Sequence, residues 1–74
     1  MRVEVRLFAT LREKRFDTEV REYPPGFTVG QVLDDLDIPE SEAKIVFVNS
    51  RHAKFEQVLN DGDILGVFPP IGGG

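Results

Sequence analysis

The sequence contains no cysteine. Without thiols, the fold cannot depend on disulfides, and no thiol is available for catalysis, persulfide transfer or metal binding. The sequence also has no run of about 18 apolar residues, and no charged segment leads into an apolar stretch at its start. We therefore expect a cytoplasmic protein with no membrane partner.

Basic residues are also scarce relative to acidic ones. The chain has 9 Lys and Arg against 13 Asp and Glu, which gives a net charge of −4. An acidic domain without a basic, aromatic-rich patch repels phosphate backbones, so we expect no nucleic-acid partner. The longest run of acidic charge, from Asp34 to Glu42, is typical of a solvated helix end and loop. A docking face for a basic partner is the alternative interpretation of that run.

Candidate catalytic and metal-binding residues are few. His52 is the only histidine, and we expect it in a surface turn with no base or metal shell around it. Asp34 and Asp35 are adjacent, so they point to different faces of a helix and do not form an acid/base pair. Asp61-Gly62-Asp63 lacks the remaining ligands of a calcium loop. We predict no metal site and no cofactor bound by this chain, and therefore no catalysis by the chain alone.

The first third of the chain has the pattern of a β-hairpin. Residues alternate in polarity over 2–8, and residues 18–23 place Val20 among polar neighbours, which predicts two strands joined by a loop at 9–17. On the first strand one face is apolar, and Phe8 falls on the opposite, polar face. On the second strand we expect Val20 to point inward. The inward residues predicted for the first strand are Val3, Val5 and Leu7.

A short helix is predicted after the hairpin. Pro24-Pro25-Gly26 ends the second strand, because proline lacks a ladder donor and glycine supplies a turn. Thr28 is a suitable N-cap, and Pro39 stops the helix near Asp37. The apolar residues at helical spacing are Val29, Val32, Leu33 and Leu36.

The second half of the chain adds strands. We expect strands over 45–49 and 64–68, with a turn at 49–53, a short edge segment at 55–59 and a tight turn at 60–63. The order β-β-α-β-β predicts an α+β domain with a mixed sheet of four to five strands and one main helix. For the first and last strands to be well covered, they should lie side by side at the centre. That arrangement is the β-grasp, here over residues 1–70.

The last residues, 71–74, are predicted to form a flexible tail. Pro69 and Pro70 direct the chain away from the sheet, and Gly72, Gly73 and Gly74 follow. No helix and no Lys-Ser or Lys-Thr comes after these glycines, so they cannot form a phosphate-binding loop. Residues without a Cβ atom can enter a narrow slot, which would deliver the Gly74 carboxylate into another protein's active site. A frayed terminus is the alternative.

The carboxylate of such a tail has chemistry of its own. A terminal carboxyl has a reference pKa of about 3.3–3.7 and is ionised at neutral pH. It can then attack the α-phosphate of ATP, and the resulting anhydride accepts a second nucleophile.

A docking surface is also predicted near this tail. With Leu65 and Val67 inward on the last strand, Ile64 and Phe68 point outward. If the first and last strands are neighbours, Phe8 joins these two residues on one exposed apolar surface. A cluster of this kind indicates an interface.

Two segments resemble a known family. They are Phe8-Ala9-Thr10-Leu11-Arg12-Glu13, and Asp61-Gly62-Asp63 together with Phe68-Pro69-Pro70-Ile71-Gly72-Gly73-Gly74. They resemble the MoaD/ThiS-like sulfur-carrier family, which includes the small subunit of molybdopterin synthase. The resemblance implies a ubiquitin-like β-grasp fold.

The resemblance further implies that Gly74 is adenylated by an E1-like enzyme of the MoeB/ThiF type, which uses ATP and Mg. A sulfur donor then converts Gly74 to a thiocarboxylate. The sulfur would pass to precursor Z in the large subunit of molybdopterin synthase. The partner-binding residues expected are Phe8, Arg12, Ile64, Phe68, Pro69 and Pro70, with Arg12 adding a salt bridge.

Several alternatives stay open. Many family members end in two glycines after another residue, whereas this sequence has three. A carrier for the thiamine pathway or for tRNA thiolation would use the same chemistry. A ubiquitin-like protein modifier would instead join Gly74 to a lysine, and a plain binding module would have an inert tail.

Overall fold

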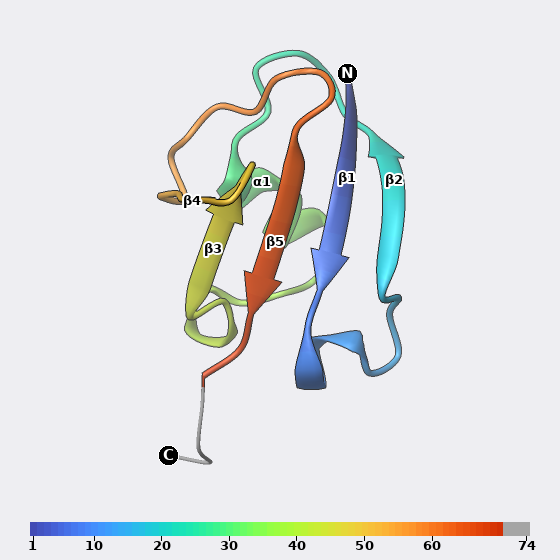
Figure 1. The fold of residues 1–74 in the computed structure, drawn as a ribbon, viewed down its shortest axis with the longest axis vertical. Helices are drawn as coiled ribbons and strands as arrows, with labels where there is room; N and C mark the ends of the chain where they lie inside the picture. The colour runs from blue at the N-terminus through green and yellow to red at the C-terminus, as the bar shows by residue number, and fades with distance from the viewer. Residues whose placement is uncertain (71–74) are drawn as a thin grey trace.

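The computed structural model describes residues 1–70, so the predicted tail at 71–74 lies outside the described residues (Figure 1). Within these residues, five strands form one mixed sheet in the order β2-β1-β5-β3-β4. The one α-helix of residues 1–70, α1 (Val29–Asp35), lies across one face of this sheet. The strands are β1 (Arg2–Leu7), β2 (Thr18–Glu22), β3 (Ile45–Val48), β4 (Arg51–His52) and β5 (Ile64–Phe68).

The first and last strands lie at the centre of the sheet, as predicted. β1 and β5 are parallel, with Glu4 opposite Ile64 and Leu7 opposite Val67. β2 is antiparallel to β1, and β3 is antiparallel to β5. Because β1 and β5 run in the same direction, both end at the same end of the molecule (Figure 1). The predicted α+β, ubiquitin-like β-grasp fold is confirmed.

The core lies between the sheet and α1. The inward side chains of β1 and β5 are completely buried, and three apolar residues of α1 cover them. Burial of each such side chain contributes roughly 1.5–3 kcal/mol to stability. These buried residues are Val3, Val5, Leu7, Leu65, Val67, Val29, Val32 and Leu33.

α1 begins where the sequence predicts and ends slightly earlier. Thr28 accepts a hydrogen bond from the Gln31 N–H, and the Gln31 side chain accepts one from the Thr28 N–H, which forms a capping box. Asp37 has a φ of 56°, and the Ile38 N–H donates to the Leu33 carbonyl over 2.9 Å. This left-handed residue closes the helix after Asp35, so the helix ends before Pro39 can act.

Two predicted irregular segments contain regular structure. The loop predicted at 9–17 includes a 3₁₀ helix, η1 (Ala9–Arg12), because Leu11 is buried and anchors one turn to the core. The turn predicted at 49–53 is only two residues long: Asn49 and Ser50 have φ of 52° and 69°. The chain then returns as β4. A second 3₁₀ helix, η2, spans Glu40–Glu42.

Two strand predictions are wrong. The edge segment predicted at 55–59 forms no strand, and only Val58 makes an isolated bridge, to Thr28. Val20 points outward rather than inward, with 47% of its surface exposed. The register with β1 places Val20 opposite Glu4, which is on the outer face, so the alternation of β1 overrides the single apolar residue of β2.

The predicted turn at 60–63 is confirmed. Gly62 has a φ of 88°, and the Asp63 N–H donates to the Asn60 carbonyl over 3.1 Å. The buried Asp63 carboxylate accepts from the Asn49 side chain (2.9 Å) and from the Asn60 N–H (2.8 Å). One carboxylate oxygen therefore bonds within the turn, and the other bonds to the turn that follows β3. Among residues 1–70, no cluster of His, Asp or Glu has the arrangement of a metal site.

None of the helices in residues 1–70 has both the length and the apolar character needed to cross a membrane; α1 itself has 7 residues.

Candidate partner-binding surface

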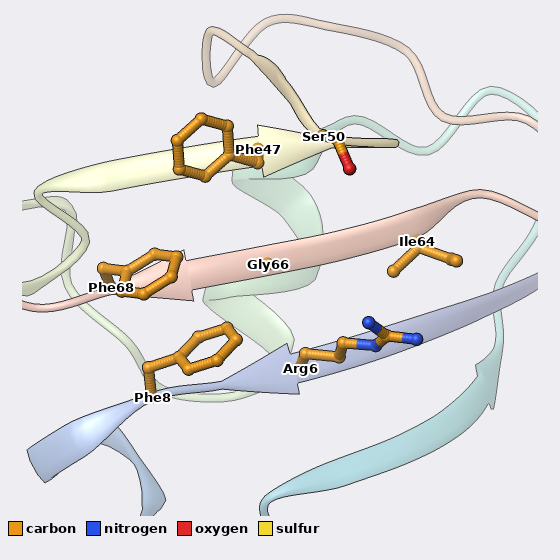
Figure 2. A pocket seen from close by; sticks show the side chains of 7 residues that line it. All are labelled: Arg6, Phe8, Phe47, Ser50, Ile64, Gly66 and Phe68. Atoms are coloured by element: carbon orange, nitrogen blue, oxygen red, sulfur yellow. The ribbon is translucent and has the colours of Figure 1, made fainter.

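The face of the sheet opposite α1 carries a shallow groove of about 330 Å³, here named the open-face groove (Figure 2). Its floor is the outward side of β1, β5 and β3, where alternate residues point away from the core. The groove is lined by Arg6, Phe8, Phe47, Ser50, Ile64, Gly66 and Phe68.

Three aromatic rings form one end of the open-face groove. The rings of Phe8 and Phe68 are stacked, with centroids 4.1 Å apart and an interplanar angle of 3°. Phe47 meets Phe68 edge-on, with centroids 5.9 Å apart and an angle of 85°. Gly66 lies on the same face beside these rings, and a Cβ atom there would make an ordinary van der Waals contact with the Phe8 ring, at 3.6 Å. These partly exposed rings present apolar area that a partner can bury.

Phe8 is held in place by the segment that follows β1. Its N–H donates to the Val67 carbonyl over 3.2 Å, which extends the pairing of the two central strands by one residue. The Arg12 guanidinium lies over the Phe8 ring, 5.4 Å from its centroid. Arg12 Nε also donates to the Leu7 carbonyl (2.7 Å) and lies 3.6 Å from an Asp17 carboxylate oxygen. Arg12 thus fixes η1 beside the aromatic rings.

The predicted partner-binding residues are not all in contact. Phe8 and Phe68 touch at the end of β5, whereas Ile64 lies at the other end of that strand (Figure 2). Pro69 is half-buried and Pro70 is exposed. The Phe68 carbonyl accepts from the Lys44 N–H over 2.9 Å, after which Pro69 has no N–H to continue the ladder. The role of these residues in partner binding stays a prediction, and Gly72, Gly73 and Gly74 lie outside the described residues.

Sequence reasoning missed Phe47, Arg6 and Ser50. The segment 45–49 is almost entirely apolar, so its alternation cannot be read without knowing its neighbour. The strand pairing shows which way these residues point: Phe47 on β3 and Arg6 on β1 both lie opposite Gly66 of β5. Residues opposite each other share a face of the sheet, so Phe47 and Arg6 lie on the open face with Gly66.

The open-face groove is mainly apolar. Three phenylalanines and Ile64 line it, and Arg6 and Ser50 are its polar side chains. His52 is exposed, as predicted, but it lies in β4 rather than in a turn, with its ring 4.5 Å from that of Phe47. Arg6, on the rim, pairs with Glu4. The groove can accept apolar side chains of a partner.

The described residues contain one clearly shifted pKa, and it lies away from the groove. Burial, together with a 3.1 Å hydrogen bond from its hydroxyl to Asp35, raises the pKa of Tyr23 to about 12. Asp35 also lies 3.7 Å from the Arg21 guanidinium. This group joins β2 to α1 and is structural.

Comparisons with known proteins agree with this geometry. The model of the ThiS family matches residues 5–74. The Haloferax volcanii HVO 2177 protein is 33% identical, with a TM-score of 0.82 over 100% of this chain and 87% of that one. SAMP1 from the same organism is 26% identical, with a TM-score of 0.79 over 100% of both chains.

A putative molybdopterin converting factor subunit 1 from Pyrococcus furiosus is 28% identical, with a TM-score of 0.76 over 96% of this chain and 99% of that one. No match was found among curated proteins. The matched residues include every lining residue of the open-face groove and the glycines that follow β5 in the sequence. The chain therefore belongs to the ThiS family of MoaD/ThiS-like, ubiquitin-fold sulfur carriers.

Proposed function

We propose that this chain carries sulfur on its Gly74 carboxylate and serves as the small subunit of molybdopterin synthase, donating sulfur to precursor Z. One observation carries the proposal. The aromatic end of the open-face groove lies on β5, the strand that leads directly into Pro69, Pro70 and the glycines. A partner that holds Phe8 and Phe68 therefore holds the chain close to the residues it has to modify.

The proposed reaction needs an activating enzyme. The ionised Gly74 carboxylate attacks the α-phosphate of ATP, and pyrophosphate leaves. Hydrosulfide delivered by a sulfur donor then attacks the acyl carbon of the adenylate, and AMP leaves with one of the two carboxylate oxygens, so one oxygen is replaced by sulfur. An E1-like enzyme of the MoeB/ThiF type would supply the ATP site, Mg and the cations that stabilise transferred charge. The described residues of this chain supply the docking surface.

The molybdopterin pathway is favoured by one comparison. The Pyrococcus furiosus protein bears the name of a molybdopterin converting factor subunit, and its similarity extends over nearly the whole of both chains. In the proposal, the large subunit of molybdopterin synthase binds the open-face groove and takes Gly74 into its active site. The proposal also gives Arg12, which contacts the Phe8 ring, a salt bridge to the partner at the margin of that interface.

A second candidate is a ubiquitin-like modifier, which the similarity to SAMP1 favours. SAMP1 is a small archaeal modifier protein, and the likeness covers the full length of both chains. In that case a lysine amine, rather than a sulfur nucleophile, would attack the activated Gly74. Carriers for thiamine synthesis or tRNA thiolation would share the activation step and differ in the acceptor.

The direct test is the intact mass of the chain after incubation with its cognate activating enzyme, ATP, Mg and a sulfur donor. We expect a gain of about 16 Da, the exchange of one oxygen for sulfur at an activated carboxylate. A variant lacking Gly73 and Gly74 is the control: it should keep the mass it starts with and unfold like the parent chain. An unchanged mass with an enzyme shown to adenylate the chain would overturn the sulfur-carrier proposal.

Acceptor assays then separate the pathways. Loss of the added sulfur on mixing with the large subunit and precursor Z would support the molybdopterin assignment. Retention of sulfur there would contradict that assignment, while a thiol-resistant conjugate of higher mass would favour the modifier.

A further inference from the structure

β2 is an outer strand with one free edge. Its other edge pairs with β1, and no element of residues 1–70 pairs with its outer side (Figure 1). At five residues β2 is longer than β4, the two-residue strand at the opposite edge. A free edge of this length can pair with a strand from another molecule.

The backbone groups that face this free edge can be identified from the ladder. The Leu7 N–H donates to the Asp17 carbonyl, and the Tyr23 N–H donates to the Met1 carbonyl. Because hydrogen-bonded pairs alternate in an antiparallel ladder, the odd-numbered residues of β2 bond to β1. The N–H and C=O groups of the even-numbered residues, Thr18, Val20 and Glu22, therefore point outward from the sheet.

The side chains of β2 are complementary to a second copy of themselves. In an antiparallel pair centred on Val20, each Glu19 lies opposite the Arg21 of the other copy, and the two Val20 side chains meet. A pair centred on Glu19 would oppose two carboxylates, and one centred on Arg21 would oppose two guanidinium groups. Opposite charges across a pair stabilise it and like charges destabilise it, so of these three registers the one centred on Val20 is favoured.

Exposure of the side chains agrees with such a contact. Val20 is 47% exposed and is one of only two large apolar side chains this exposed among residues 1–70. The Glu19 side chain is 48% exposed and the Arg21 side chain 35%. Within one chain, Arg21 contacts Glu19 at 3.2 Å and Asp35 at 3.7 Å, so the carboxylate of a second Glu19 would complete a cluster of alternating charges.

We propose that two copies of this chain associate through β2, forming one continuous antiparallel sheet with Val20 at its two-fold axis. The axis would be perpendicular to the sheet, so both open-face grooves would lie on the same side. β5 lies two strands from β2, roughly 10 Å at ordinary strand spacing, so the aromatic end of each groove stays free. The dimer goes beyond the proposed function and is compatible with it.

The dimer should be weak. Five residues on each side bury much less than the roughly 1,600 Å² of a standard interface. We expect a Kd on the order of 0.1 mM, which sedimentation equilibrium can measure on the full chain up to about 1 mM. In NMR spectra recorded on dilution, the amide signals of Thr18, Val20 and Glu22 should move together with the fraction of dimer.

Two variant sets test the interface. Val20→Lys places two ammonium groups opposite each other and should weaken the dimer at least tenfold, whereas Val58→Lys, at the other exposed valine, should leave it unchanged. Glu19→Lys and Arg21→Glu should each be monomeric alone. Mixed in equal amounts they should associate, because every cross-strand charge pair is then opposite again.

Several specific results would contradict the β2 dimer. A chain that stays monomeric up to about 1 mM, or a dimer that Val20→Lys leaves intact, would contradict the proposal. So would β2 amide signals that respond only to an added large subunit, since they would assign this edge to a different partner. Circular dichroism of each variant confirms that it is folded.

Discussion

The two faces of the sheet are formed by the same strands but carry different side chains and have different roles. Toward α1, β1 and β5 present aliphatic side chains such as Val5 and Leu65, which are 0% exposed. Toward solvent, one residue further along, β5 presents Gly66 and the same face carries the half-exposed rings of Phe8 and Phe68. The alternation of a strand therefore separates two energetic roles: the covered face contributes stability, and the open face contributes recognition.

This division has a physical basis. A closely packed aliphatic layer loses stability whenever volume is removed, because the surroundings collapse only partly. Half-exposed rings contribute less to folding and keep apolar area that a partner can bury. Substitutions on the two faces should therefore separate the free energy of unfolding from the affinity for a partner.

The largest effect is expected on the covered face. Leu65→Ala removes a fully buried side chain from the central strand and should lower the free energy of unfolding by about 3 kcal/mol. Chemical denaturation measures this loss. Leu65→Met, which roughly keeps the volume, should cost less than about 1.5 kcal/mol. A loss below about 1 kcal/mol for the alanine variant would show that this layer is not closely packed.

A smaller stability effect and a large binding effect are expected on the open face. Phe68→Ala removes the stack with Phe8 and the edge contact with Phe47. We expect about 1 kcal/mol less stability and at least a tenfold weaker affinity for the activating enzyme, measured by calorimetry. Phe55→Ala is the matched control, because Phe55 is also half-buried but lies outside the groove. If Phe68→Ala and the parent chain bind the activating enzyme with equal affinity, the open face does not contribute to recognition of that enzyme.

The smallest effect is expected at the polar margin of the covered face. Tyr23→Phe removes the hydrogen bond to Asp35 and should lower the free energy of unfolding by about 1 kcal/mol at neutral pH. It should also change the pH dependence. The pKa of Tyr23 rises from 10.0 to about 12 on folding, so above pH 10 the unfolded chain loses this proton first.

The stability that Tyr23 contributes is therefore present below pH 10 and is lost as the pH rises toward 12. Unfolding curves of the parent chain and of Tyr23→Phe, recorded from neutral pH to pH 12, measure the difference. If the free energy of unfolding falls equally steeply with pH above pH 10 in the two proteins, the loss of stability does not come from Tyr23.

Much of this division could be predicted from the sequence. The alternation over 2–8 places Phe8 outward because it follows Leu7, and the structure agrees. The position of β1 beside β5 followed from the need to cover two well-formed strands, and it brings Phe8 to Phe68. Local patterns suffice where apolar and polar residues alternate clearly.

The features that sequence reasoning missed depend on pairing across the sheet. Val20 was expected inward because it is the apolar residue of its strand, but its register opposite Glu4 turns it outward. Phe47 lies in an apolar run whose two faces look alike in sequence, and only its position opposite Gly66 reveals its direction. β4 and η1 are too short for a periodic pattern, and tertiary contacts such as the burial of Leu11 define them.

The most direct test of the central claim joins the open face to the chemistry of Gly74. It is the initial rate at which the species heavier by about 16 Da forms on the parent chain and on Phe68→Ala, with the activating enzyme limiting. If the open face recruits the enzyme that modifies the tail, the rate should fall at least about tenfold in the variant while its fold is retained. Equal rates for the two chains would contradict the account.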